Sequence, residues 1–157
     1  AQESRGLGDV YKRQTFIVGF PGETDTHYQA LRSFVEAQRF DKVGIFTYSE
    51  EEDTPAAKMA QKVPEEVMQE RYHDLMSLQS KISEEINVSL EGKEVDVLIE
   101  GRDEEQEGIS IGRSYREAPE VDGQIYIESD TESRVGDIAR VRLLQGFTYD
   151  IVGEKVH

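Results

Sequence analysis

The sequence predicts an α/β remnant, a long linking helix and a small antiparallel β-barrel, in that order along 157 residues. Three observations predict this fold class. Two continuous apolar runs flank a helical pattern near the start, apolar residues recur at helical spacing through the middle, and beyond residue 88 short apolar–polar alternations lie between glycines. A chain of this length with 36% hydrophobic residues can form one ordinary domain or two small ones.

The first predicted unit is a βαβ crossover over residues 15–48. Residues 15–20 and 43–48 are continuous apolar runs, which are typical of strands buried on both faces. Between them, Thr24 is a plausible N-cap for a helix that ends near Gln38. The crossover makes the strands parallel. Because one helix cannot cover both faces of such a sheet, we interpret residues 15–62 as the end of a larger α/β domain.

A single long helix is predicted over Pro64–Asn87, within a linking segment at 63–88, after a polar loop at 49–62. We expect its apolar stripe to pack against the larger α/β domain rather than to hold a cofactor. The stripe consists of Met68, Tyr72, Leu75, Ile82 and Ile86, with Met76 beside it.

Residues 89–157 are predicted to form a five-stranded antiparallel barrel of the oligonucleotide-binding kind, with the domain boundary near residue 88. Apolar residues alternate with polar ones in each predicted strand, and glycines separate the strands. The alternating residues are Val95, Val97 and Ile99; Ile109 and Ile111; Ile125 and Ile127; Val141 and Leu143; and Phe147, Tyr149 and Ile151.

Composition excludes several classes of site. The absence of cysteine excludes a disulfide framework, a Cys-ligated zinc site and an iron–sulfur cluster held by this chain alone. No apolar run approaches the roughly 20 residues of a membrane helix, and no signal peptide is apparent. We therefore expect a cytoplasmic protein with no membrane partner. Residues 1–14 show no periodicity, and we interpret them as a non-native or disordered leader.

Two local patterns are candidate ligand or metal sites. Residues 19–24 (GFPGET) lie between a predicted strand and a predicted helix, the place where α/β folds bind ligands, although the motif alone favours a tight turn and a helix cap. His27, His73 and His157 are too scattered for a metal site. No catalytic set emerges from the residues themselves.

Three segments together resemble a known family. Residues 16–24 (FIVGFPGET) and 40–57 (FDKVGIFTYSEEEDTPAA) resemble the last two strands of the partial TIM-like barrel in radical S-adenosylmethionine methylthiotransferases. Residues 63–76 resemble the linking helix of those enzymes, and residues 90–156 resemble their terminal TRAM domain.

The resemblance favours one branch of that family. Residues 112–123 (GRSYREAPEVDG) are similar to the branch that modifies an aspartate of small-subunit ribosomal protein number twelve, rather than the branch that modifies transfer RNA. Glu50 stands where that branch commonly has Pro, and Asp53 where it often has Gly, which affects only a loop.

The resemblance implies a cofactor and a chemistry. Such enzymes hold two four-iron–four-sulfur clusters on upstream cysteines and use S-adenosylmethionine to insert a methylated sulfur at the aspartate β-carbon. This chain, without cysteine, is then expected to be inactive by itself. By position, Ile17, Gly19, Phe46 and Tyr48 are candidates for lining the adenine of the cofactor, and plain barrel core is an equal explanation for Ile17 and Phe46. Catalytic and metal-binding residues are not expected in this chain.

The resemblance and the charge together predict the partner. Residues 89–157 carry 17 acidic and 8 basic residues, a net charge of −9 within a chain of net charge −15. This domain attracts a basic ribosomal protein and repels RNA, apart from a small basic patch at Arg113 and Arg116. The candidate substrate-binding residues are Arg113, Tyr115, Glu117, Glu120 and Asp122, and we expect a monomer. Two alternatives stay open, which are a transfer-RNA methylthiotransferase and a non-enzymatic acidic module that binds a basic protein.

Overall fold

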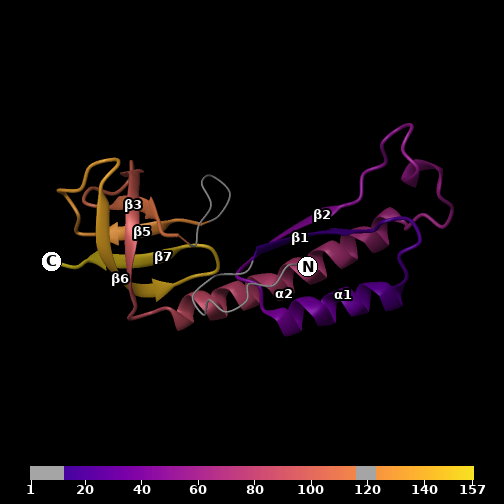
Figure 1. Ribbon diagram of the computed structural model, residues 1–157, viewed down its shortest axis with the longest axis horizontal. Coiled ribbons are helices and arrows are strands. Elements are labelled where there is room, and N and C mark those ends of the chain that lie inside the picture. The colour runs from indigo at the N-terminus through magenta and orange to yellow at the C-terminus, as the bar shows by residue number, and fades with distance from the viewer. Residues whose placement is uncertain (1–12, 116–122) are drawn as a thin grey trace. The chain divides into compact units, whose positions relative to one another are not determined.

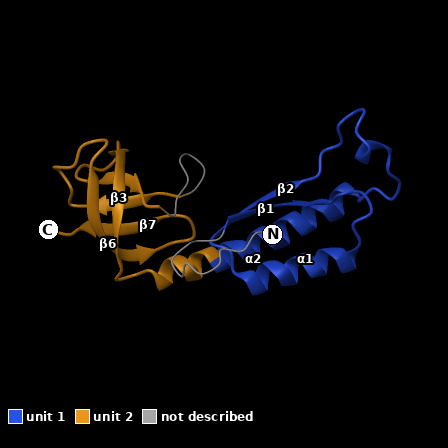
Figure 2. Cartoon of the chain, viewed as in Figure 1, with its two compact units in different colours: residues 1–82 blue, residues 83–157 orange. Residues whose placement is uncertain are grey.

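The computed structural model describes residues 13–115 and 123–157, and the chain divides into two compact units, residues 1–82 and 83–157 (Figure 2). The long helix α2 (Glu65–Ser89) contributes residues to both units. It begins one residue later and ends two residues later than the predicted helix. Within the two described ranges, no helix is both long enough and apolar enough to span a membrane.

The first unit contains the predicted βαβ crossover (Figure 1). Strands β1 (Arg13–Val18) and β2 (Lys42–Thr47) pair in parallel and are joined by helix α1 (Asp25–Gln38). Strand β1 starts two residues earlier than predicted, so Arg13 and Gln14 belong to the sheet and not to the leader. They pair with Lys42 and Val43 because backbone hydrogen bonds extend a strand whether or not its side chains are apolar.

Helix α1 begins and ends with local signals. The Thr24 hydroxyl accepts a hydrogen bond from the backbone N–H of His27, and the Nδ1 atom of His27 accepts one from the backbone N–H of Thr24. This reciprocal capping box satisfies two N–H groups at the helix start and confirms the predicted cap. At the other end Arg39 adopts a left-handed conformation, with φ of 48°, and its N–H bonds to the carbonyl of Val35.

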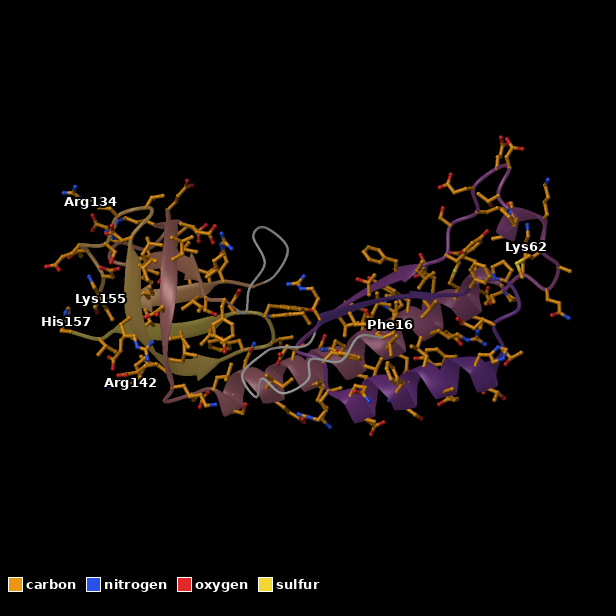
Figure 3. The ribbon with its side chains drawn as sticks, viewed as in Figure 1. Phe16, Lys62, Arg134, Arg142, Lys155 and His157 are labelled. Atoms are coloured by element: carbon orange, nitrogen blue, oxygen red, sulfur yellow. The ribbon has the colours of Figure 1, made fainter. Side chains whose placement is uncertain are left out.

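Helix α2 packs on the βαβ crossover itself, on the same face of the sheet as α1 (Figure 1). Leu75 is completely buried there, and the Nε2 atom of Gln79 donates to the carbonyl of Phe40 at 2.8 Å. Phe16 of β1 (Figure 3) packs against Phe34 of α1, with the two ring centroids 6.3 Å apart. Part of the α2 stripe therefore packs against the crossover, which we interpret as the end of the larger domain, because the crossover has an apolar face that a second helix must cover.

The second unit is a closed barrel with the strand order β3–β4–β5–β7–β6. The strands are β3 (Glu94–Arg102), β4 (Ser110–Arg113), β5 (Ile125–Glu128), β6 (Ile138–Gly146) and β7 (Ile151–Lys155). The prediction of a purely antiparallel barrel is wrong, because β5 and β7 pair in parallel. A closed ring with an odd number of strands cannot have every neighbouring pair antiparallel, so at least one parallel pair is unavoidable.

The barrel interior is apolar, and seven of its eight buried core residues were expected at alternating strand positions. These core residues are Val97, Ile99, Ile125, Ile127, Ala139, Val141, Leu143 and Ile151. Strand β4 is the exception, since Ser110 and Gly112 are buried while Ile111 is only half-buried. A Cβ on Gly112 would lie 2.4 Å from the carbonyl oxygen of Leu98, so no larger residue fits at this inward position.

Strand β7 starts at Ile151, later than the alternation of apolar residues from Phe147 onwards predicts. Phe147 and Tyr149 were expected in a strand with Ile151, but they lie in the turn between β6 and β7 and are 45% and 57% exposed. The N–H of Phe147 donates to the carbonyl of Asp150 at 2.8 Å, which closes the turn. Alternation in sequence does not distinguish a strand from a tight turn that exposes every second side chain.

Candidate functional site

Parallel strands β1 and β2 end at the same edge of the sheet, and the predicted cofactor residues lie there. Ile17 and Phe46 are neighbours across the two strands and are 56% and 60% exposed. Their neighbours Val18 and Ile45 are buried under the helices. Ile17 and Phe46 therefore form an apolar surface on the sheet face that α1 and α2 do not cover.

The segment that follows β1 is held in a tight conformation at this edge. Gly19 has φ of +84°, and a Cβ there would lie 2.3 Å from the sulfur of Met68. Its N–H donates to the Oε1 atom of Glu23 at 3.2 Å, and the N–H of Gly22 donates to the carbonyl of Gln61 at 2.9 Å. The absence of a side chain at Gly19 thus makes room for helix α2.

A nearly buried ion pair anchors the same segment to α2. The Nη1 atom of Arg71 lies 2.7 Å from the Oε1 atom of Glu23 and also donates to the Glu23 carbonyl at 3.3 Å. The side chains of Arg71 and Glu23 are only 11% and 12% exposed. Sequence reasoning missed this pair, because the residues are 48 positions apart and no local spacing relates them.

Tyr48 follows the end of β2 and completes this edge. Its N–H donates to the carbonyl of Val18 at 2.8 Å, and its ring packs edge-on against Phe20 with the centroids 5.5 Å apart. The Tyr48 hydroxyl is buried and has no hydrogen-bond partner among the residues that the structure describes. A buried hydroxyl of this kind is a donor and acceptor available to a ligand or to a further segment of protein.

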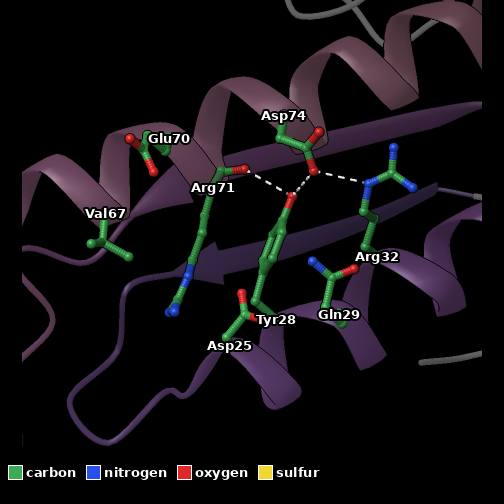
Figure 4. Close-up of a pocket in the computed structure, with 8 residues that line it drawn as sticks. All are labelled: Asp25, Tyr28, Gln29, Arg32, Val67, Glu70, Arg71 and Asp74. Atoms are coloured by element: carbon green, nitrogen blue, oxygen red, sulfur yellow. Dashed lines mark hydrogen bonds and ion pairs between the residues drawn. The ribbon is translucent and has the colours of Figure 1, made fainter.

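A second polar cluster lies between α1 and α2 and lines an open cavity of about 390 Å³ (Figure 4). The Tyr28 hydroxyl donates to the Oδ2 atom of Asp74 at 2.5 Å, and the Nε atom of Arg32 donates to the same carboxylate oxygen at 2.9 Å. The guanidinium of Arg71 lies 5.7 Å from the centre of the Tyr28 ring. These contacts join the two helices.

The charge states in this cluster are fixed by its contacts. Burial, together with the hydrogen bond to Asp74, raises the pKa of Tyr28 above its usual range. The hydrogen bond from Tyr28 and the contacts with Arg32 lower the pKa of Asp74. Tyr28 thus stays protonated and Asp74 ionised at neutral pH, which favours a structural role over proton transfer.

Among the described residues of the barrel, Asp130 has a deeply buried carboxylate, and this residue is 2% exposed. It accepts hydrogen bonds from the Ser110 hydroxyl at 2.8 Å and from the backbone N–H groups of Glu132 and Ser133 at 3.2 and 3.0 Å. Burial alone would raise the pKa of Asp130, but the hydrogen bonds from Ser133, Ser110 and Glu132 outweigh it and lower the pKa to about 2.

The candidate substrate-binding residues of the barrel are partly described. Arg113 ends β4 with its Nε atom 3.3 Å from a carboxylate oxygen of Glu100, and Tyr115 is 60% exposed two residues later. Three other candidates, and the basic residue Arg116, lie outside the described residues. These three are Glu117, Glu120 and Asp122. Within residues 13–115 and 123–157, no group of His, Asp and Glu side chains is arranged to hold a metal ion.

The fold and the family comparison define the class of the second unit. Residues 92–156 match the TRAM domain family, and the barrel of β3 to β7 occupies this range. The second unit of the chain is therefore similar to the TRAM domain.

Nearly the whole chain is homologous to a particular group of enzymes. It is 48% identical over 150 residues to the ribosomal protein uS12 methylthiotransferase RimO of Syntrophotalea carbinolica, an alignment that covers 96% of this chain and 33% of that protein. The proteins of the same name from Geobacter sulfurreducens and Caldanaerobacter subterraneus are 46% and 42% identical. These alignments cover 94% and 96% of this chain, and 33% and 34% of the relatives. The chain thus spans about a third of the length of these relatives, and the predicted resemblance is confirmed.

Proposed function

We propose that this chain is the carboxyl-terminal third of a methylthiotransferase that modifies an aspartate of ribosomal protein uS12. One observation carries the proposal, which is the 42–48% identity, over nearly the whole chain, to enzymes of that name. The chain lacks cysteine, so the ligands of any iron–sulfur cluster must come from the rest of such an enzyme. This chain alone is then inactive.

The first unit fits the end of a larger radical S-adenosylmethionine barrel. Helices α1 and α2 cover one face of its two-stranded sheet, while Ile17 and Phe46 are exposed on the other face among the described residues. Parallel strands are normally buried on both faces, so the uncovered face is suited to further strands and their ligand.

The edge residues fit the adenine side of S-adenosylmethionine. Ile17 and Phe46 provide an apolar surface on which a planar base can lie, and the buried Tyr48 hydroxyl is free to bond to a polar atom of the base. Gly19, held by Met68 and Glu23, keeps the neighbouring backbone in place. The cofactor, once bound, supplies the radical chemistry, and these residues bind it, orient it and exclude water.

The acidic barrel is proposed to recognise uS12 in the cytoplasm, with Arg113, Tyr115, Glu117, Glu120 and Asp122 as candidate contacts. Its net charge of −9 over residues 89–157 favours a basic protein over RNA. On the outside of the barrel, Arg142 (Figure 3) is paired with Glu94, and Arg140 is paired with Asp96. These pairs reduce the positive charge available to phosphate groups.

The decisive experiment joins this chain to the first two thirds of the Syntrophotalea carbinolica relative in place of its own last third. We expect the chimera to add a methylthio group to uS12, detected by mass spectrometry, while the relative truncated without replacement does not. Transfer of the group to transfer RNA, with none on uS12, would assign the chain to the other branch of the family.

The cofactor edge is tested separately by binding. In the same chimera, Phe46→Ser should weaken S-adenosylmethionine binding by about tenfold in equilibrium dialysis, because it removes an apolar contact. The matched control is Ile138→Ser on the barrel, where the side chain is 73% exposed. Equal affinity for the cofactor in the two variants would exclude Phe46 from the site.

A further inference from the structure

The turn between β6 and β7, residues 147–150, carries two exposed aromatic side chains, and we refer to it as the aromatic turn. Phe147 is 45% and Tyr149 is 57% exposed, although both follow a pattern that predicts a strand. Tyr115, 60% exposed, follows β4, and β4 ends where its antiparallel neighbour β5 begins. Large exposed aromatic residues at one end of a small barrel are typical of binding surfaces.

The aromatic turn is held rigidly by its surroundings. The Nδ2 atom of Asn87, which is buried at the end of α2, donates to the carbonyl of Phe147 at 2.7 Å. The Oδ1 atom of Asp150 accepts the N–H of Gln124 at 2.8 Å, and a Cβ on Gly123 would lie 1.7 Å from the carbonyl oxygen of Tyr149. A turn fixed by contacts of this kind loses little conformational entropy when a partner binds.

Among the residues that the structure describes, three carboxylates contact the aromatic turn or the residue next to it. Glu91 accepts the N–H of Gly146 at 3.0 Å, and an oxygen of Glu84 lies 3.5 Å from the Thr148 hydroxyl. Asp150 is the third, within the turn itself. The aromatic rings therefore lie in a negative potential, which the barrel's net charge of −9 over residues 89–157 reinforces.

We infer that the aromatic turn binds an extended, arginine-rich polypeptide segment, with guanidinium groups on the rings of Phe147 and Tyr149 and ion pairs to the surrounding carboxylates. Arginine suits this surface because its planar cation both stacks on aromatic faces and pairs with carboxylates. This inference rests on the proposed function only for the basic character of the partner, and it adds Phe147 and Tyr149 to the candidate contacts at 113–122. Aromatic rings also stack on bases, but the carboxylates disfavour a phosphate backbone.

The test measures binding of the intact chain to three probes by isothermal titration at about 0.15 M salt. The probes are a short peptide of alternating arginine and glycine, the same peptide with neutral citrulline in place of arginine, and a single-stranded RNA of equal length. The double variant Phe147→Ala/Tyr149→Ala should bind the arginine peptide about tenfold more weakly than the parent chain. The matched control is Val135→Ala/Ile138→Ala, which removes two side chains that are 71% and 73% exposed elsewhere on the barrel.

The expected result is binding of the arginine peptide alone, weakened by the aromatic variant and unchanged by the control. Circular dichroism and thermal melting of both variants establish that the barrel remains folded. Equal weakening by both variants, or binding of the citrulline peptide as tightly as the arginine peptide, would overturn the inference. Tighter binding of the RNA than of the arginine peptide would contradict the inference and would indicate that the partner is a nucleic acid.

A parallel titration with uS12 separates this inference from the proposed function. If uS12 binds the parent chain and the aromatic variant equally, the aromatic turn is not the recognition surface and the proposed function stands. If uS12 fails to bind while the arginine peptide still binds through the turn, the partner in the proposed function is wrong and the surface is retained.

Discussion

The Met68 side chain packs directly against the Gly19 backbone and occupies the space that a Gly19 side chain would need. A Cβ on Gly19 would lie 2.3 Å from the Met68 sulfur. This close approach brings helix α2 onto the backbone that follows β1. The left-handed conformation of Gly19 and the thioether of Met68 are therefore two parts of one packing arrangement.

Gly19→Ala should destabilise the first unit by about 3 kcal/mol, because it adds both left-handed strain and a steric clash. Gly22→Ala is the matched control, since Gly22 has φ of +90° and no atom lies within 4 Å of an added Cβ. That variant should lose only about 1 kcal/mol. Amide hydrogen exchange of peptides from residues 13–82 measures both changes. Equal losses would exclude the Met68 contact as a cause.

Arg71→Met should destabilise the same unit by about 3 kcal/mol, because it leaves the Glu23 carboxylate buried without its cation. The double variant Glu23→Gln/Arg71→Met should recover much of that loss, since no buried charge remains. A double-mutant cycle in urea measures the coupling free energy between the two residues. Additive losses would show that the pair does not anchor the segment.

The free energy of unfolding of the barrel should decrease in acid, because Asp130 becomes protonated. Its pKa is lowered to about 2 in the folded state, from an ordinary value of 3.8. The ionised carboxylate therefore stabilises the fold fully above about pH 4, and that contribution, about 2 kcal/mol, disappears as the pH falls towards 2. Asp130→Asn should flatten the dependence of unfolding free energy on pH in this window, and Ser110→Ala should reduce it in part. An unchanged slope in Asp130→Asn would contradict this assignment.

Gly112→Ala should disrupt the barrel, because the new methyl group would lie 2.4 Å from a backbone oxygen in β3. We expect a loss of about 3 kcal/mol in thermal or urea unfolding. Gly101→Ala is the matched control within a strand, since no atom lies within 4 Å of its Cβ position. That variant should change stability by less than about 0.5 kcal/mol. A similar loss at both positions would indicate backbone entropy rather than close packing.

Truncation should show which elements fold together. Residues 83–157 have a closed barrel and should give dispersed amide spectra and a cooperative melt when expressed alone. Residues 13–62 should remain unfolded, while residues 13–82 should fold, because helix α2 supplies Leu75 and Gln79 to cover the sheet. A folded 13–62 fragment would show that α2 is not needed for this core.

The positions of the local elements follow from the amino-acid sequence alone. Continuous apolar runs, the Thr24 cap and the helical spacing of Met68, Leu75 and Ile82 locate β1, α1, β2 and α2 to within two residues. These features depend only on residues that are close together in the chain, so they can be recognised in a single sequence. The family resemblance likewise rested on contiguous segments. The predicted cofactor pair Ile17 and Phe46 came from matching strand positions, and the parallel register places the two side by side.

The contacts that the side chains of those elements make become apparent only in the folded protein. The ion pair of Glu23 and Arg71 spans 48 positions, and the inward placement of Gly112 depends on the backbone of β3. The exposure of Phe147 and Tyr149 depends on contacts with Asn87 and Gln124, far away in the chain. Barrel closure and helix packing bring such distant groups together, and the free energy of these contacts depends on three-dimensional distance rather than on sequence spacing.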